Sequence, residues 1–449
     1  MPFFAVPIDL PPDVVELRVG DADADGVDEL VAISAKRRGT QPDAISVNIL
    51  NMDAQASVTD SWRLDLRDQA LLIDIDHGLW ALGPTGIMAL EAEGARTVFE
   101  SRTALSGLGQ TAAAFADICE DMDGDGTVEC VIARGRTVKV IDVEGRERAK
   151  VRVRSRGELE VRSRGGTQVV ASAVSPVWSL DDFDGDGVKD LLLPDGKRLT
   201  VVALDGDGPS TSMEVSLPID VSPFRDEDKR KKSETQRRVI SVWLEDMNGD
   251  NKTDFAAQIW VTKGSWLGSE GEVVYAPGTG KGFGPLQRLP SERAVLMVRL
   301  IDVDGDGDKE LSSAEMDFGV ANLTRALLTQ KIKVELMVRT MTPTGVSAAE
   351  LLHSVVVPIS NDREPPVEIK HDLTGDGIPD MVSAQGTTEV QVFRGTGKGY
   401  SKTPVASLDV GFKQGEDKIW TGDITGDGRS DLIVWKPRTK SATVLLLKD

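Results

Sequence analysis

The sequence predicts an all-β fold, a single β-propeller built from blades of four short antiparallel strands. Three observations lead to this prediction. A nine-residue Asp-rich segment recurs seven times along the 449 residues, an apolar run of strand length follows each copy, and turn residues separate further short runs within each unit. A repeat architecture also accounts for the chain length, because each unit packs only on its neighbours.

The Asp-rich segment carries side-chain oxygen at positions one, three, five and nine of every copy. The seven copies, called loops 1 to 7 here, contain at these positions Asp21, Asp23, Asp25 and Glu29; Asp121, Asp123, Asp125 and Glu129; Asp182, Asp184, Asp186 and Asp190; Asp246, Asn248, Asp250 and Asp254; Asp302, Asp304, Asp306 and Glu310; Asp372, Thr374, Asp376 and Asp380; and Asp423, Thr425, Asp427 and Asp431.

This pattern favours calcium, a hard cation that takes six to eight oxygen ligands. Position six is Gly in six loops and Asn251 in loop 4, the residue types that best tolerate the positive φ of a tight turn. Position seven has a different kind of side chain from loop to loop, so we expect its backbone carbonyl to bind the ion. An Asp-Gly turn without metal is the alternative for any single copy. An EF-hand is excluded, because no loop has Glu at position twelve. The sequence therefore predicts up to seven calcium ions.

Eight blades are the expected number, with seven as the alternative. The gap between loops 1 and 2 is long enough for an additional unit, and strand-like runs begin there at Ala70, Gly78 and Ile87. The segment Asp74-Ile75-Asp76-His77 in this unit is too short to be a cation loop, and it lacks the oxygen-bearing residues of the later positions. We therefore expect eight units, of which seven carry a cation loop.

Residues 1–449 are expected to form this one domain. The last unit has only three strands, so we predict that the N-terminal segment, about residues 1–10, supplies the fourth and closes the ring. Two insertions are expected: a charged loop at about 224–238, and a short amphipathic helix at about 319–330 with Val320, Leu323, Ala326 and Leu327 on one face.

The loop pattern, Asp-x-Asp-x-Asp-Gly-x-x-Asp/Glu between strands, resembles the FG-GAP and VCBS repeats found in integrin α-subunit heads and many bacterial surface proteins. Residues 278–284 and 395–400, which read Gly-Thr-Gly-Lys-Gly before an aromatic residue, also look like that family's glycine-aromatic turn. The resemblance implies a calcium-binding propeller. Integrin heads have seven blades with some loops occupied, whereas nearly every unit here has a loop. The family contains adhesins, lectins, scaffolds and some polysaccharide lyases, so fold alone does not give function.

Composition narrows the range of functions. A net charge of −21 argues against a nucleic-acid partner, which needs Lys and Arg fields. No run of eighteen apolar residues is present, so no membrane-spanning segment is expected. The start, Met-Pro-Phe-Phe, lacks the pattern of a secretory signal. We nevertheless expect an extracellular, cell-surface or periplasmic location, with the leader absent from this chain, because the resemblance is to exported proteins. A protein that stays inside the cell is the alternative.

The expected function is non-enzymatic: a secreted or cell-surface binding, adhesion or scaffold protein with a protein or glycan partner. A lectin or a polysaccharide lyase on the same propeller is the alternative. The three histidines, His77, His353 and His371, stand in no recognisable nucleophile setting. Three tryptophans precede loops and would either stack on sugar or pack in the core, namely Trp178, Trp243 and Trp420.

The two cysteines lie at the two ends of loop 2. Cys119 precedes its first ligand position and Cys130 follows its last, on strands expected to run antiparallel. Facing residues in such a pair are close enough for a disulfide. Two reduced, buried side chains remain the alternative.

Overall fold

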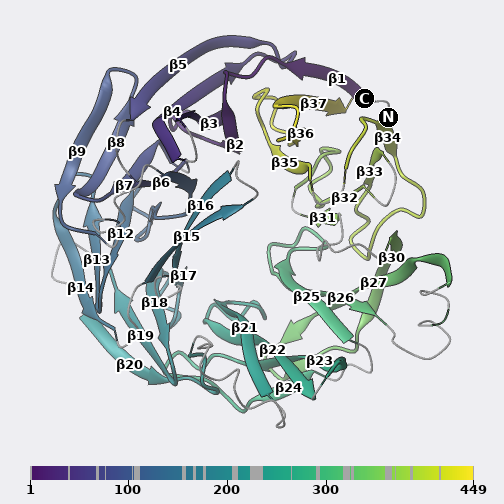
Figure 1. Ribbon diagram of the computed structural model, residues 1–449. Helices are drawn as coiled ribbons and strands as arrows, with labels where there is room; N and C mark the ends of the chain where they lie inside the picture. Colours follow the sequence, from purple (N-terminus) through teal and green to yellow (C-terminus); the bar gives the residue numbers. More distant parts are fainter. Residues whose placement is uncertain are drawn as a thin grey trace.

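The computed structural model consists of antiparallel sheets arranged in a closed ring (Figure 1). It describes residues 3–38, 41–66, 70–75, 77–103, 105, 112–153, 158–164, 168–174, 178–204, 211–222, 236–263, 265–289, 294–316, 324, 328–358, 367–369, 371–384, 388–413 and 416–447. Eight sheets form the blades, which confirms the predicted all-β propeller and its eight blades.

Blades 1 to 4 come from the first half of the chain. Blade 1 contains β2 (Val14–Gly20), β3 (Glu29–Arg38), β4 (Gln41–Met52) and β5 (Val58–Leu66); blade 2 contains β6 (Ala70–Asp74), β7 (Trp80–Gly83), β8 (Gly86–Glu91) and β9 (Gly94–Glu100); blade 3 contains β11 (Cys119–Glu120), β12 (Glu129–Arg134), β13 (Thr137–Asp142) and β14 (Glu147–Arg152); and blade 4 contains β17 (Ser179–Asp181), β18 (Asp190–Asp195), β19 (Arg198–Ala203) and β20 (Thr211–Ser216).

Blades 5 to 8 complete the ring. Blade 5 contains β21 (Gln236–Glu245), β22 (Asp254–Lys263), β23 (Ser265–Ala276) and β24 (Gln287–Leu289); blade 6 contains β25 (Ala294–Ile301), β26 (Glu310–Met316), β27 (Lys331–Arg339) and β30 (Glu350–Pro358); blade 7 contains β31 (Val367–Ile369), β32 (Met381–Ser383), β33 (Glu389–Phe393) and β34 (Ala406–Asp409); and blade 8 contains β35 (Lys418–Gly422), β36 (Asp431–Lys436), β37 (Ser441–Leu447) and β1 (Phe3–Ile8).

The two ends of the chain meet in blade 8. Strand β1 pairs antiparallel with β37 from Phe3↔Leu447 to Ile8↔Ala442. Both termini lie at this side of the ring in Figure 1. The first and last strands of the sequence therefore share one sheet, and their backbone hydrogen bonds hold the ring closed.

The core lies between neighbouring blades. The second strand of a blade is apolar on both faces because it is covered by a blade on each side. In β3, Val31 and Ile33 pack in the cluster that contains Ile73 of blade 2. The alternate residue, Leu30, packs in the cluster that contains Trp435 of blade 8. Successive side chains of a strand point to opposite faces, so one apolar strand joins three blades.

Five additional strands lie outside the four-stranded pattern in the described part of the chain. Strand β10 (Ala112–Phe115) pairs in parallel with β6 and makes blade 2 five-stranded. The hairpin of β15 (Glu158–Arg164) and β16 (Gln168–Val174) lies on the inner side of the ring, with β16 beside β10 (Figure 1). A second small hairpin, β28 (Met341–Thr342) and β29 (Gly345–Val346), connects two strands of blade 6.

The two expected insertions fall largely outside the described residues. The charged insertion extends less far than predicted: Gln236, Arg237 and Arg238 belong to β21, where they pair with residues of β22. In the expected helix, Thr324, Leu328 and Thr329 are helical, and the residues of its apolar face lie outside the described part. Among the described residues, no helix has the length and apolar character needed to cross a membrane.

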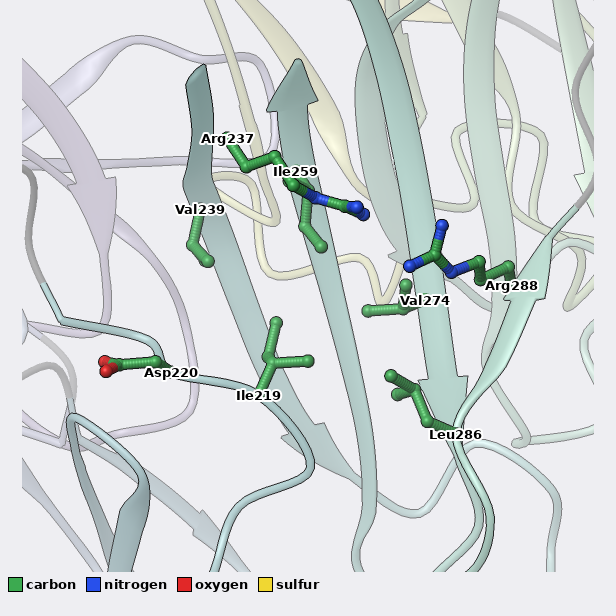
Figure 2. Close-up of a pocket in the computed structure, with 8 residues that line it drawn as sticks. All are labelled: Ile219, Asp220, Arg237, Val239, Ile259, Val274, Leu286 and Arg288. Carbon is green, nitrogen blue, oxygen red and sulfur yellow. The ribbon is translucent and has the colours of Figure 1, made fainter. Parts of the chain in front are cut away.

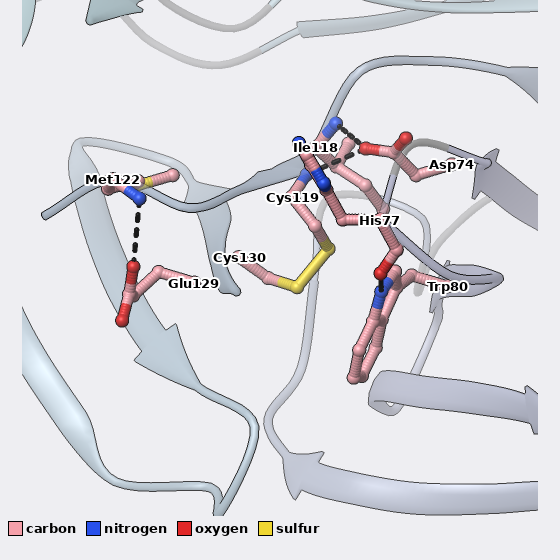
Figure 3. The surroundings of a disulfide bond; sticks show 8 residues. All are labelled: Asp74, His77, Trp80, Ile118, Cys119, Met122, Glu129 and Cys130. Carbon is pink, nitrogen blue, oxygen red and sulfur yellow. Dashed lines mark hydrogen bonds between the residues drawn. A yellow bond between two sulfur atoms is a disulfide. The ribbon is translucent and has the colours of Figure 1, made fainter. Parts of the chain in front are cut away.

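The cysteines form a disulfide between Cys119 of β11 and Cys130 of β12, with the Cα atoms 4.0 Å apart. The two residues face each other in the antiparallel register. Figure 3 shows the bond beside Asp74, whose Oδ2 accepts hydrogen bonds from the backbone N–H groups of Ile118 (2.5 Å) and Cys119 (2.7 Å). Blade 2 is thus tied to the first strand of blade 3 at the disulfide.

Candidate metal centres

Each Asp-rich loop connects the first and second strands of its blade and is folded by its own carboxylates. The Asp at position one accepts a hydrogen bond from the backbone N–H of position six in all seven loops, at 2.6–3.0 Å. The acid at position nine accepts one from the N–H of position two in loops 1 to 6. These bonds use backbone donors that a tight loop would otherwise leave unpaired.

Position six has the left-handed backbone conformation that its composition predicts. The φ angle is +89° at Gly26 and +58° at Asn251, the one non-glycine residue in this column. A side chain with a branched Cβ would be strained at such an angle. The turn brings positions one and three toward the acid that begins the next strand.

Carboxylates converge in four of the loops. In loops 1, 2 and 3 the acids at positions one, three and nine each place an oxygen within 4.8 Å of the others; in loop 5 the acids at positions one, three and five do so. The exposed position-five acids of loops 1 to 3 and Glu310 of loop 5 are not part of these groups. Four of the predicted sites thus have clustered acids, and the ligand assignments themselves stay predictions.

Loops 4, 6 and 7 have a neutral residue at position three that contacts the acid at position nine. Asn248 Nδ2 donates to Asp254 Oδ1 at 2.9 Å, and Thr425 Oγ1 donates to Asp431 Oδ2 at 2.9 Å. In loop 6 the Thr374 backbone N–H donates to Asp380 Oδ2 at 2.8 Å. The position-nine charge in these loops is therefore shared with a neutral donor.

The buried acid at position nine dominates the electrostatics of the loops. Burial, added to the nearby loop carboxylates, raises the pKa of Glu29 to about 8 and that of Glu310 to about 7. The same causes raise the pKa of Asp190 to about 6. The pKa values are raised because the anion loses hydration and meets other negative charges. A divalent cation among these oxygens would offset both effects.

Loops with clustered acids fit a calcium ion by their donor set, which is all oxygen. Loop 4 fits a calcium ion for a different reason, which is that it contains buried oxygens without a hydrogen-bond partner. Asn248 Oδ1 and Asp250 Oδ1 are buried and accept no hydrogen bond within the described part of the chain. Buried polar atoms are almost always paired, and a cation is one way to pair them. Thr374 Oγ1 of loop 6 is likewise buried and has no hydrogen-bond partner within the described part of the chain.

Position four of the loops also matters for the fold, and the sequence analysis did not single it out, although its residues are nearly uniform. It is Gly in six loops and Ala24 in loop 1. A Cβ on Gly305 would lie 2.6 Å from the backbone oxygen of Gly377 in the next loop, and one on Gly185 would lie 3.1 Å from that of Asn251. The glycines at position four of loops 3 to 7 are therefore the points at which successive loops touch.

Backbone hydrogen bonds also link successive loops. The N–H at position eight donates to the carbonyl of position one in the preceding loop: Asp28 to Asp423 (3.0 Å), Thr253 to Asp182 (3.0 Å) and Ser430 to Asp372 (3.3 Å). We call loops 3, 4, 5, 6, 7 and 1, in this order around the ring, the loop arc. Contacts at position four or these hydrogen bonds connect every neighbouring pair in it.

The glycine-aromatic turns hold the position-nine acids of loops 4 and 6. The N–H of Gly278 donates to Asp254 Oδ1 at 2.6 Å, and that of Gly395 donates to Asp380 Oδ1 at 2.8 Å. Phe283 of the first turn stacks edge-on against Phe183 of the preceding blade, with ring centroids 6.0 Å apart. The turns thus connect a loop to the neighbouring blade.

The tryptophans that precede loops are partly buried and pack against core clusters, as the core-packing alternative expects: Trp178, Trp243 and Trp420. His353 packs against Phe393, with ring centroids 4.9 Å apart, and burial lowers its pKa. His371 accepts a backbone hydrogen bond from Asp380 through its carbonyl. None of these contacts forms a nucleophile and base pair.

A cavity of about 190 Å³ lies between blades 4 and 5. Figure 2 shows Arg237 and Arg288 pointing toward one another above Ile259 and Val274. Both guanidinium groups form ion pairs with Glu272, the one from Arg288 at 3.1 Å. The arginines of this cavity are therefore already paired within blade 5.

Comparison with known proteins gives one family match. Residues 372–434 match the model of the FG-GAP-like repeat. This segment contains loop 6, the second glycine-aromatic turn and loop 7. No curated protein sequence matches the chain.

Several solved structures are similar in shape at low identity. A lectin of Agrocybe aegerita that recognises non-reducing terminal N-acetylglucosamine is 15% identical, with 83% of this chain and 86% of that chain covered and a TM-score of 0.42. BBS1N in complex with ARL6DN is 11% identical, with 98% and 94% covered and a TM-score of 0.41. The V. cholerae biofilm matrix protein Bap1 is 13% identical, with 96% and 77% covered and a TM-score of 0.29. Likenesses this distant support no statement about function.

The family match and the ring of eight blades agree with the resemblance seen in the loops. The chain is an eight-bladed β-propeller in which residues 372–434 match the FG-GAP-like repeat.

Proposed function

We propose that this propeller binds calcium in its Asp-rich loops and that the metal-loaded ring serves as a non-enzymatic binding or scaffold protein. The observation that carries the calcium part is the convergence of carboxylate oxygens within 4.8 Å in repeated loops of one chain. Like charges at such a distance repel one another, and a divalent ion reverses the sign of that interaction.

The role of the residues follows from their contacts. The acids at positions one and nine bind backbone N–H groups through one or both oxygens, which fixes the orientation of the carboxylates before any ion arrives. Calcium would supply the charge that these oriented oxygens lack. The ion would therefore stabilise a loop whose shape the hydrogen bonds already define, and through the loop contacts it would stabilise the ring.

Thermal unfolding in excess chelator, compared with excess calcium, tests the calcium part. A ligand that binds only the native state contributes about 2.7 kcal/mol per site at one hundred times its Kd. With several sites we expect Tm to fall on the order of 10 °C in chelator. Magnesium is the control ion, because it prefers a smaller octahedral site. Identical unfolding curves in chelator and in calcium would contradict the proposal.

The binding role is supported by where the polar groups lie. Among the described residues, the clustered carboxylates belong to the loops, and the three histidines take part in packing, backbone contacts or a turn. These contacts support a role of the acids and histidines in the fold, and on this ground we propose a binding role. The partner is a protein or a glycan, because the ring presents a large surface of loops and strand edges.

A glycan array run in parallel with a pull-down from the native organism distinguishes the two kinds of partner. Specific calcium-dependent glycan binding would make the protein a lectin, and a single enriched protein would make it a scaffold. Release of shortened, unsaturated oligosaccharides from a bound polysaccharide would instead reveal a lyase and refute the non-enzymatic role.

The disulfide supports an exported protein. Disulfides persist in oxidising compartments and are rare in the cytosol. We therefore propose an extracellular, cell-surface or periplasmic location. Thiol titration of the unfolded protein, isolated from its native source, should find no free thiol; two free thiols would argue for a reducing compartment.

A further inference from the structure

Loop 2 contains a positive charge supplied by the chain itself. Arg148 extends from β14 of the same blade, and its Nη2 donates to Asp123 Oδ2 at 2.8 Å. Its Nη1 lies 3.6 Å from Glu129 Oε1. Asp123 and Glu129 are positions three and nine of the loop, two of the three acids that converge there.

Burial shows that this ion pair lies inside the loop rather than on its surface. The side chains of Arg148, Asp123 and Glu129 are 12%, 8% and 2% exposed. A guanidinium in this position has its charge where a metal ion would need to lie, and it is held further by a contact of its Nη2 with the carbonyl of Leu204 in blade 4. A divalent ion bound by these acids would be repelled by the guanidinium at close range, so we expect the two cations to exclude one another.

Other loops differ in this respect. Arg394 pairs with Asp376 of loop 6 at 2.7 Å and Arg429 with Asp427 of loop 7 at 3.0 Å, and both arginines are far more exposed, at 48% and 30%. These partners are position-five acids on the outer side of the loop. In loops 1, 3 and 5, no ion pair joins a described Lys or Arg to any of the four ligand positions.

We infer that the guanidinium of Arg148 takes the place of a metal ion in loop 2, so that this loop does not bind calcium in the native protein. The inference rests on the proposed calcium binding of the other loops. If Arg148 occupies loop 2, the largest expected number of calcium ions falls from seven to six. The inference also assigns Arg148 a role that the loop motif does not reveal.

Two matched substitutions at position five test the assignment. Asp125 in loop 2 and Asp186 in loop 3 are both exposed, and each accepts a hydrogen bond from the backbone N–H of position seven; Asp125 also accepts one from the Thr127 hydroxyl. Native mass spectrometry in calcium gives the number of bound ions. We expect Asp125→Ala to hold the same number as the parent protein and Asp186→Ala to hold one fewer.

Substitution of the arginine provides the converse test. Arg148→Met keeps the apolar stem and removes the charge, so the three acids of loop 2 become available and the protein should bind one additional calcium. Arg148→Lys keeps a positive charge and should add none. Arg394→Met, at the exposed pair of loop 6, is the control and should also add none.

Two results would overturn the inference: loss of one ion in Asp125→Ala, or no gained ion in a folded Arg148→Met. If Arg148→Met does not fold, the Asp125→Ala count decides alone, since that exposed substitution leaves the ion pair in place. A parent protein that binds no calcium contradicts the proposed function instead. An ion gained on removal of Arg148 would still support the assignment of loop 2 in that case.

Discussion

The loop arc and the junction of blades 2 and 3 hold neighbouring blades together in different ways. In the arc, successive loops touch so closely that position four has no room for a side chain, as at Gly305. At the junction, blade 2 has no Asp-rich loop. On the other side of blade 3, where position four of loop 2 would face loop 3, a Cβ on Gly124 would meet no heavy atom within 4 Å. Among the described residues, the contacts at position four therefore begin at loop 3 and end at loop 1.

The junction has other connections instead. The disulfide braces the ends of loop 2, Asp74 receives two backbone N–H groups from the start of blade 3, and β10 adds a parallel strand to blade 2. Arg148 neutralises the loop from within. Neighbouring blades are therefore held in two ways: by contacts between Asp-rich loops along the arc, and by a disulfide, hydrogen bonds and an ion pair around the junction.

Removal of calcium should produce the largest difference in stability between the loop arc and loop 2, because it acts on several loops of the arc together. We expect the position-six amides of loops 1, 3 and 5, such as Gly187, to exchange hydrogen on the order of 100-fold faster in chelator, which corresponds to about 2.7 kcal/mol of lost protection. The amide of Gly126 in loop 2 should change little. Hydrogen exchange read by mass spectrometry measures both, and equal acceleration in all the loops would remove the distinction.

The second largest difference is expected when alanine replaces the glycine at position four, in loop 5 of the arc or in loop 2. Gly305 and Gly124 have similar φ angles, +81° and +76°, so alanine at either position costs about 1–2 kcal/mol of backbone strain. Gly305→Ala also forces a Cβ to 2.6 Å from a backbone oxygen, which adds about 1–3 kcal/mol. Urea unfolding should therefore show the larger loss for Gly305→Ala. Equal losses would mean that the neighbouring loop moves aside freely.

Loss of the disulfide should weaken the junction by a smaller amount. Cys119 and Cys130 are separated by 11 residues, so cross-linking them constrains only a short loop of the unfolded chain. Replacement of both by Ala should lower the free energy of unfolding by about 2–3 kcal/mol in the chain-entropy model. The exchange of amides in β11 and β12 should rise while that of the arc stays as it was. An unchanged stability would show that the other contacts at the junction are sufficient.

The smallest effect is expected at Ala24, the one position-four residue with a side chain. It has a φ of +61° and is exposed, and the next blade has no Asp-rich loop. Ala24→Gly relieves backbone strain but increases the entropy of the unfolded chain, and these effects are opposite in sign and similar in size. The free energy of unfolding should change by less than about 1 kcal/mol. A large loss would indicate a contact of this methyl group in the native ring.

The repeated loop and the apolar runs that follow it were sufficient to predict the strands, the blades and their number. These are local properties: alternating or continuous apolar residues form a strand, and a fixed spacing of carboxylates forms a turn. The incomplete last unit also pointed to the N-terminal segment, and β1 does pair with β37. Blade 2 was recognisable without its loop because its strands kept the apolar pattern.

Only the tertiary structure decided features that depend on residues distant in sequence. The register of β11 and β12 places Cys119 opposite Cys130 and selects the bridge over two thiols. Arg148 reaches Asp123 across 25 positions of the chain, and the glycine at position four is explained by a loop from the next blade. By itself the sequence determined which residues form the loops; the packing of blades determined which loops touch and which one contains its own cation, because those contacts arise only when the ring closes.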